Sequence, residues 1–391
     1  VGEDWSDGIE KPEYQVLIML ATLGMLLMIS ANDLISLYMG LELQSLPLYV
    51  IAAMNTRSLK SSEAGLKYFL LGALSSGMLL YGASLIYGFS GSTQFEEIAT
   101  MISQDGASSG MIIGVVFLLS GLAFKVSAAP FHMWTPDVYE GAPTPVTALF
   151  AIAPKVAAIT LLLNLTHFVF ADIRLEWMQV IIALSVASMV VGAFGAIMQK
   201  DLKRMMAYSS IAHMGYALAG LAAGTQQGVA GVMIYMTTYI FMGAGTFSII
   251  LMMRRDGIPV QKLSDLSGLS YTHPYWAFSL MIFMFSMAGI PPLSGFFAKW
   301  YVFLAAVNAG LIPLAVIGVL TSVVGAFYYI RIIKLMYFED VDQPLDLGTS
   351  KENIVILSLT LVVTVLFVFI IGPLREWTYL AANIFPISGA L

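Results

Sequence analysis

Residues 111–136 read MIIGVVFLLSGLAFKVSAAPFHMWTP. An apolar run of about 20 residues is the length that an α-helix needs to cross a hydrocarbon core of ~30 Å. This run ends at Pro130, and Pro136 follows closely; proline removes a backbone donor and interrupts a helix. Lys125 lies inside the run, just before the first proline. The stretch therefore predicts a membrane-spanning helix that is broken beside a charge.

The remainder of the chain repeats this pattern. Hydrophobic residues make up 59% of the 391 residues and charged residues only 11%, too little charge to cover a soluble protein of this size. The apolar runs are continuous rather than alternating, which favours helices over a barrel. We therefore expect an all-α polytopic membrane protein with about eleven transmembrane helices. The expected spans are Tyr14–Ser30, Leu34–Met54, Leu66–Phe89, Met111–Ala129, Thr144–Phe170, Met178–Met198, Arg204–Ala223, Val229–Met253, Tyr275–Val307, Leu311–Lys334 and Ile354–Ile371.

A second broken span is expected at Pro291-Pro292, shortly before Lys299. This second broken span lies five spans after the first. Because five is an odd number, the two broken spans would cross the membrane in opposite directions, as in inverted-repeat transporters. The sequence thus predicts two inverted five-helix repeats, residues 14–170 and 171–338. Residues 339–391 would form a polar loop and a last transmembrane helix. Residues 1–13 are a polar segment, and because no initiator Met precedes them we expect the chain to continue upstream.

Lysine and arginine predict the orientation, because cytoplasmic loops carry an excess of them. The loops opposite the basic ones hold little beyond Arg174 and Arg375. A cytoplasmic start and an odd number of spans would put the C-terminus on the outer, periplasmic side. The basic loops carry Arg57, Lys60, Lys200, Lys203, Arg204, Arg254, Arg255, Lys262, Lys334 and Lys351.

A few charges lie within the apolar spans, where each costs roughly 2.5–3.5 kcal/mol on insertion scales. Stability does not explain such a set. Structural ion pairing, for example between Glu42 and Lys67, and lysines that snorkel to the interface are the alternative reading. A buried lysine loses its proton readily, and a nearby carboxylate favours the charged form again. We therefore predict a proton relay. Its candidates are Glu42, Lys67, Lys125, Lys155 and Lys299.

Histidines give weaker candidates. His132 follows the first break and would lie in a hydrated path, while His213 would bridge the lysine sites as a relay that works near neutral pH; an ordinary hydrogen-bonded histidine explains His213 almost equally well. The four histidines show no i, i+4 pair typical of a helical metal site. The chain has no cysteine, which excludes disulfides, thiolate-ligated metals and iron–sulfur clusters held by this chain.

These residues lie in stretches that resemble the antiporter-like N subunit of respiratory complex I, the proton-translocating NADH:quinone oxidoreductase. The resemblance is to the bacterial type, the counterpart of the mitochondrial NADH dehydrogenase subunit 2, and runs over nearly the whole chain. It implies that Glu42 is the helix glutamate that pairs with a lysine, that Lys125 and Lys299 are the broken-helix lysines, that Lys155 is the central lysine, and that Lys67 is a further family lysine. The stretches are MGLELQSLPLYVI, EAGLKYFLLGALSSG, LAFKVSAAPFHMWTPDVYEGAPTPVT, APK at Lys155, KDLKRMMAYSSIAHMGY and AGIPPLSGFFAKWYVF.

The resemblance implies a proton-translocating subunit of the bacterial inner membrane. NADH, FMN, iron–sulfur clusters and quinone would bind other subunits, and this chain would hold no cofactor. Its partners would be other membrane-arm subunits, including neighbouring antiporter-like and small subunits, and membrane lipids, with no nucleic acid. Two alternatives stay open: a subunit of a multi-subunit cation/proton antiporter, and a structural subunit of the membrane arm that does not pump.

Overall fold

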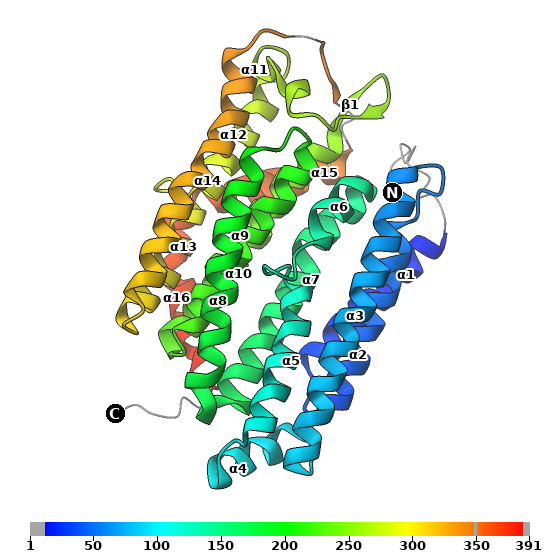
Figure 1. Ribbon diagram of the computed structural model, residues 1–391. Helices are drawn as coiled ribbons and strands as arrows, with labels where there is room; N and C mark the ends of the chain where they lie inside the picture. Colours follow the sequence, from blue (N-terminus) through cyan, green and yellow to red (C-terminus); the bar gives the residue numbers. More distant parts are fainter. Residues whose placement is uncertain (1–11, 342, 348–349, 386–391) are drawn as a thin grey trace.

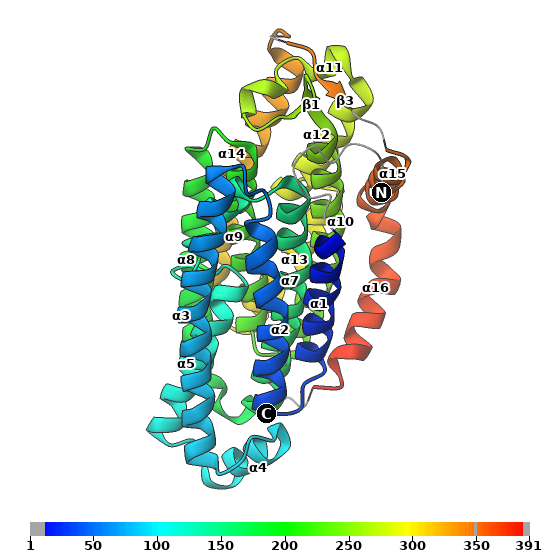
Figure 2. The same ribbon diagram turned by 90° about the vertical axis from the view of Figure 1, so that its right-hand side faces the viewer.

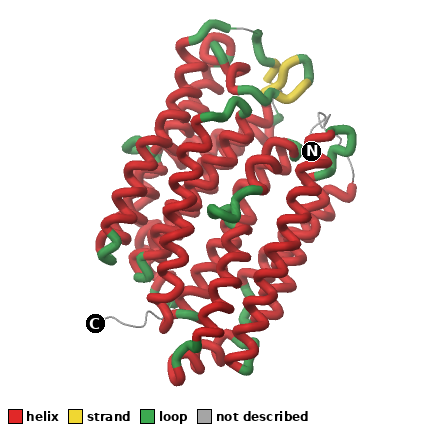
Figure 3. Tube along the Cα trace, viewed as in Figure 1, coloured by secondary structure: helices red, strands yellow, loops and turns green. Residues whose placement is uncertain are grey.

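The computed structural model describes residues 12–341, 343–347 and 350–385, so most of the expected polar segment 1–13 lies outside the described residues. The described chain is a bundle of long helices with one small sheet at an end (Figures 1 and 3). The helices of 11 or more residues are α1 (Pro12–Ile29), α2 (Leu34–Ala52), α3 (Leu59–Ser90), α4 (Phe95–Asp105), α5 (Ser109–Lys125), α7 (Thr144–Asn164), α8 (Arg174–Ile197), α9 (Leu202–Ala222), α10 (Gln226–Met252), α12 (Pro274–Ala288), α13 (Ser294–Asn308), α14 (Ile312–Phe338), α15 (Lys351–Val365) and α16 (Phe367–Ala382).

Shorter elements join the long helices. The longest of them, α6 (Trp134–Gly141), has eight residues and follows the first helix break. The others are η1 (Leu165–Val169), η2 (Ala171–Ile173), β1 (Met253–Arg255), β2 (Ile258–Pro259), η3 (Leu263–Leu266), α11 (Leu269–Thr272) and β3 (Asp346–Leu347).

The helical, multi-pass membrane architecture is confirmed, whereas the expected count of eleven spans is not. By length and composition, seven segments are apolar enough to cross a membrane, and the pair α15–α16, bent by 81°, would make an eighth. The other expected spans do not meet this test for physical reasons. Two of them are interrupted, which leaves short halves such as α5 and α12, and α9 begins with basic residues and carries a buried row of polar side chains.

Both predicted helix breaks are present. Figure 3 shows the loop between α5 and α6 in the middle of the bundle. The second break separates α12 from α13 and contains Pro291 and Pro292. Pro136 was expected to contribute to the first break, but it lies within the first turn of α6, where proline needs no backbone donor and is tolerated. The inverted relation between the two halves stays a prediction.

Small residues bring neighbouring helices close together. The main pairings are α1 with α2, α3 with α5, and α8 with α9. On α3, a Cβ added at Gly82 would lie 2.6 Å from the carbonyl oxygen of Gly114 on α5. Such glycine contacts are the usual way for membrane helices to approach closely, because lipid supplies no hydrophobic force between them.

The end of the bundle that carries most of the basic loops has a cap (Figure 2). There β1 pairs antiparallel with β2 and with β3, so the α10–α12 connection is joined to the loop that follows α14. Arg255 reinforces the cap with an ion pair to Asp265 at 3.0 Å. The described residues between α14 and α15 form no helix and contain β3. At the opposite end of the bundle lies α4, a helix that the hydropathy pattern did not predict because it is short and amphipathic.

Candidate functional site

Lys125 is the last residue of α5, and its ammonium group is buried against α2. The Nζ atom donates hydrogen bonds to the Ser45 hydroxyl at 2.7 Å and to the Tyr49 hydroxyl at 3.3 Å. The helix ends here because Ser127 has a left-handed backbone (φ 63°), a conformation that no α-helix continues through. The break therefore fixes the lysine at the junction of two helices.

Glu42 lies on the same face of α2 as Ser45 and Tyr49, because residues three, four and seven apart share one side of a helix. It is half-buried and accepts a hydrogen bond from the Ser76 hydroxyl on α3. The resemblance implies that Glu42 pairs with a lysine, but among the described residues there is no ion pair between Glu42 and Lys125. Ser45 and Tyr49, rather than Glu42, hold the ammonium.

Lys155 lies in the middle of α7 and is completely buried, with 0% of its surface exposed. Its ammonium donates a hydrogen bond to the Ser210 hydroxyl on α9. Ser210 in turn shares a hydrogen bond of 2.9 Å with the Tyr239 hydroxyl on α10. The ring of Tyr139 on α6 covers the ammonium, with its centroid 5.4 Å from Nζ.

Lys299 lies on α13, just after the second break. Its Nζ atom donates to the backbone carbonyls of Met287 at 2.9 Å and Ala288 at 3.0 Å, the last residues of α12. A third hydrogen bond, of 2.7 Å, goes to the Ser322 hydroxyl on α14. The ring of Tyr216 lies 5.1 Å away.

The three buried lysines share one kind of environment. Each ammonium donates to a serine hydroxyl of another helix and lies over a tyrosine ring. In the part of the chain that the structure describes, none has a carboxylate within 4.0 Å. Hydroxyl oxygens and ring faces accommodate an ammonium, and a hydroxyl can also donate to a neutral amine. The sites are thus compatible with both protonation states of lysine.

His213 lies on α9 one turn after Ser209 and Ser210, and is buried. One of its ring nitrogens, Nδ1, is 2.6 Å from the Tyr235 hydroxyl, and the other, Nε2, is 3.0 Å from the Tyr329 hydroxyl. Tyr329 also hydrogen-bonds to Ser209. Neutral imidazole has one donor and one acceptor nitrogen. The hydrogen bonds from Tyr235 through His213 to Tyr329 therefore run in one direction, and this direction reverses when the histidine changes tautomer.

His132 lies where it was predicted, in the loop between α5 and α6. Its Nδ1 atom is buried, without a hydrogen-bond partner among the described residues. A buried ring nitrogen without a partner is costly, and ordered water is the usual remedy.

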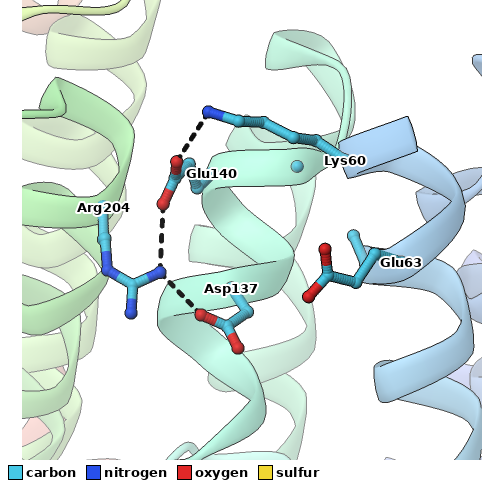
Figure 4. Close-up of a pocket in the computed structure, with 7 residues that line it drawn as sticks. Lys60, Glu63, Asp137, Glu140 and Arg204 are labelled. Atoms are coloured by element: carbon cyan, nitrogen blue, oxygen red, sulfur yellow. Dashed lines mark hydrogen bonds and ion pairs between the residues drawn. The ribbon is translucent and has the colours of Figure 1, made fainter. Parts of the chain in front are cut away.

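Lys67 differs from the other predicted lysines. Its side chain is 41% exposed and forms ion pairs of 2.6 Å with Glu63, one turn before it on α3, and with Asp137 on α6. Glu42 is not among its partners. The sequence did not single out Asp137, Glu140 or Arg204, which line a cavity of about 200 Å³ beside Lys60 and Glu63 (Figure 4). The signal was present in WTPDVYEG, where two carboxylates lie one helical turn apart.

The described residues hold no group of three or more His, Cys, Asp or Glu side chains that could bind a metal ion.

Residues 31–325 match the family model of the transmembrane part shared by NADH:quinone oxidoreductases and Mrp antiporters. The NADH-quinone oxidoreductase subunit N of Parvibaculum lavamentivorans is 60% identical over 368 residues, which is 94% of this chain and 76% of that protein. The chain belongs to the subunit N family of the NADH-quinone oxidoreductases.

Solved structures of membrane complexes contain chains with a similar fold. A chain of respiratory complex I from Thermus thermophilus, solved with bound aureothin, is 34% identical with a TM-score of 0.78, over 91% of this chain and 78% of that one. A chain of the Mrp complex from Dietzia has a TM-score of 0.82 over 94% of this chain and 77% of that one, but at 23% identity it shows the fold alone.

Proposed function

We propose that this chain translocates protons in the membrane arm of an NADH:quinone oxidoreductase, through a relay of buried lysines. The observation that carries the proposal is the set Lys125, Lys155 and Lys299, each at most 7% exposed and each solvated by a serine hydroxyl and a tyrosine ring without a carboxylate partner in the described residues. A lysine held in this way can exist as amine or ammonium, which is the chemistry of a proton carrier.

The relay begins at Glu42 and Lys125. Their separation in this structure represents one state of a pair that opens and closes. When Glu42 approaches, its negative charge favours the ammonium form of Lys125; when it withdraws, the lysine releases its proton. Quinone reduction in other subunits would drive this change by altering the charge state of the membrane arm.

The central part of the relay is built around α9. Ser210 holds Lys155, and His213, one turn later, connects Tyr235 with Tyr329. Protons would pass from Lys155 through water and these hydroxyl and imidazole groups toward Lys299. His132 would contribute to a hydrated path at the first break. Lys67, which the sequence predicted as a further member of the relay, differs from the buried lysines by its exposed ion pairs.

The relay implies a setting in the cell. We place the chain in the bacterial inner membrane with its C-terminus on the periplasmic side, beside neighbouring antiporter-like and small membrane-arm subunits and lipids. NADH, FMN, iron–sulfur clusters and quinone would bind to other subunits. This chain, which has no cysteine, would supply only proton-carrying side chains and no cofactor site.

The test uses native-membrane vesicles that carry Lys155→Met, after normal assembly of the complex has been checked. NADH oxidation and the resulting pH gradient are recorded together. We expect both to fall strongly, because methionine fills the space of the lysine but carries no proton. Lys351→Met, at an exposed position at the start of α15, is the matched control and should behave as the unsubstituted protein. Wild-type values for Lys155→Met would show that the lysine is structural and that the relay is wrong.

A cation/proton antiporter and a structural scaffold are the competing functions. An antiporter subunit predicts that the pH gradient depends on sodium, whereas the proton relay predicts no such dependence. A scaffold predicts that Lys125→Met and Lys155→Met leave pumping intact.

A further inference from the structure

The helix α6 is held from both sides by cations. It packs between α3 and α9 and carries Asp137 and Glu140 one turn apart on the face that lines the cavity of about 200 Å³ (Figure 4). At eight residues, α6 is too short to be stable by its own backbone hydrogen bonds. Its position must therefore depend on what surrounds it.

Each of the four carboxylate oxygens of Asp137 and Glu140 forms an ion pair with one cationic side chain. Arg204 on α9 uses one nitrogen, Nη1, for both residues, at 2.6 Å to Asp137 Oδ1 and 3.0 Å to Glu140 Oε2. From α3, Lys67 binds Asp137 Oδ2 at 2.6 Å and Lys60 binds Glu140 Oε1 at 2.8 Å. The two carboxylates thus join α3 to α9 through α6.

The end of α6 is held as well. Lys203 on α9 is buried and donates a hydrogen bond of 2.8 Å to the carbonyl of Ala142, directly after the helix. A cation at this place interacts favourably with the negative end of the helix dipole. Together with the carboxylate contacts, it fixes both the rotation and the axial position of α6.

The opposite face of α6 reaches the relay. Tyr139 lies between Asp137 and Glu140 in sequence but points inward, is completely buried, and covers the ammonium of Lys155. Its hydroxyl has no hydrogen-bond partner of normal geometry among the described residues. The orientation of α6 therefore decides whether the ring covers Lys155.

We infer that Lys67 and Arg204 are positioning residues for proton transfer, which clamp α6 through Asp137 and Glu140 so that Tyr139 covers Lys155. In this arrangement Lys67 acts by its fixed charge and does not itself carry a translocated proton. The inference rests on the proposed function, since Lys155 has to be a proton carrier for its cover to matter. It removes Lys67 from the relay and adds Tyr139 as the group through which the clamp acts.

The substitution Lys67→Arg distinguishes a positioning role of this residue from a role as proton carrier. The guanidinium of arginine keeps the positive charge but does not release a proton in proteins. A clamp therefore tolerates Lys67→Arg, whereas a proton carrier does not. In native-membrane vesicles with normal assembly, we expect Lys67→Arg to keep the wild-type pH gradient and Lys67→Met to lower it about two- to fivefold, the size of effect typical of partly exposed ion pairs. A gradient as low in Lys67→Arg as in Lys67→Met overturns the inference.

A double-mutant cycle tests the step through Tyr139. If the clamp acts through this ring, Asp137→Asn should lower the pH gradient in the natural chain but have little further effect when Tyr139→Leu is present. Additive losses overturn that step. Asp137→Asn keeps the side-chain volume and also replaces Lys67→Met where the latter fails to assemble.

These experiments distinguish failure of the clamp from failure of the proposed proton relay. If Lys155→Met pumps normally, the relay is wrong whatever the clamp variants do. If Lys155→Met is inactive and Lys67→Arg is impaired, the relay stands and only the clamp is wrong.

Discussion

Lys299 donates a hydrogen bond of 2.9 Å to the backbone carbonyl of Met287, across the break that separates α13 from α12. The lysine thus binds the C-terminal end of the preceding half-helix, where the last carbonyls lack helical donors and the dipole is negative. Lys125 at the first break donates instead to side-chain hydroxyls of α2, and within the described residues it makes no such contact with a backbone carbonyl. The two broken helices, similar in sequence pattern, therefore hold their lysines differently: the first through side-chain hydroxyls of α2, the second largely through backbone carbonyls of the preceding half-helix.

Gly289 is expected to be required for the geometry of Lys299. Its φ of +89° disfavours any side chain, and an added Cβ would lie 3.1 Å from Lys299 Cδ and 3.2 Å from its Nζ. Gly289→Ala should therefore lower the pH gradient in native-membrane vesicles by displacing the ammonium, beyond the ~1–2 kcal/mol of backbone strain that a left-handed alanine carries. Gly310→Ala is the matched control, since Gly310 has φ +78° and nothing within 4 Å. Equal effects of the two substitutions would show that strain alone is responsible.

Ser210 is expected to be as important as the lysine that it holds. Ser210→Ala removes the hydroxyl that Lys155 donates to. A hydrogen bond to a charged group contributes ~1.5–3 kcal/mol, so proton pumping coupled to NADH oxidation should slow by about tenfold or more. Ser248→Ala is a suitable control, because Ser248 is buried on α10 and its hydroxyl donates, among the described residues, to the carbonyl of Ala244 in its own helix. Pumping at the wild-type rate in Ser210→Ala would mean that Lys155 does not need this partner.

The sequence predicted where the buried lysines lie along the helices, but not which groups surround them. Continuous apolar runs and prolines are local signals, so Lys125, Lys155 and Lys299 were placed in spans or beside breaks from composition alone. Their hydroxyl partners lie 80, 55 and 23 residues away along the chain. Which of many serines meets a given lysine depends on how helices rotate and slide against each other, and no local pattern records that. The serines concerned are Ser45, Ser210 and Ser322.

The same limit explains Lys67 and α6. One partner, Glu63, is four residues away and visible in the sequence, whereas Asp137 is 70 residues away and comes close only because α6 packs against α3. The alternative reading, an ion pair between Lys67 and Glu42, is not what the structure shows, because Lys67 pairs with Glu63 and Asp137 instead. Pro136 was mispredicted for a different reason. A proline in the first turn of a helix cannot be distinguished, from the sequence alone, from a proline that ends a helix.

Asp33 caps the N-terminus of α2 outside the spans, and its contribution should depend on pH. Its Oδ1 atom accepts from the backbone nitrogens of Ile35 and Ser36, both at 2.8 Å. Partial burial raises the pKa of this carboxyl, but the hydrogen bonds from Ser36 and Ile35 outweigh burial and leave the pKa below its ordinary value. A lowered pKa in the folded state means that the stabilisation is complete above the unfolded pKa of about 3.9 and is lost as pH falls through the folded value.

Asp33→Ala should therefore lower the amide protection of residues 34–37 in hydrogen exchange at neutral pH. The loss should correspond to about 1 kcal/mol, as for other N-caps. The difference from the unsubstituted chain should shrink as pH falls below about 4, where the carboxyl becomes protonated. Asp33→Asn, which keeps a capping oxygen without a charge, should protect the amides with no such pH dependence. A loss in Asp33→Ala that is constant over this pH range would show that the charge of the cap is irrelevant.

His213 allows a direct distinction between a proton-passing and a structural role. Its two nitrogens connect the hydroxyls of Tyr235 and Tyr329 at 2.6 and 3.0 Å. Glutamine in its place can still donate and accept one hydrogen bond, but it cannot take up a proton near neutral pH. If His213 lies on the proton path, His213→Gln should stop pumping about as strongly as Lys155→Met while the complex assembles normally.

Tyr329→Phe completes this test. It removes the hydroxyl that joins His213 to Ser209, and should slow pumping by about tenfold, as expected where a buried polar group is left unpaired at a cost of ~1–3 kcal/mol. Tyr337→Phe, two turns later on the same helix and only half-buried, controls for the loss of a tyrosine hydroxyl from α14. Normal pumping in His213→Gln, together with a loss in Tyr329→Phe, would assign the network to holding α9 against α14 and take the histidine out of the proton path.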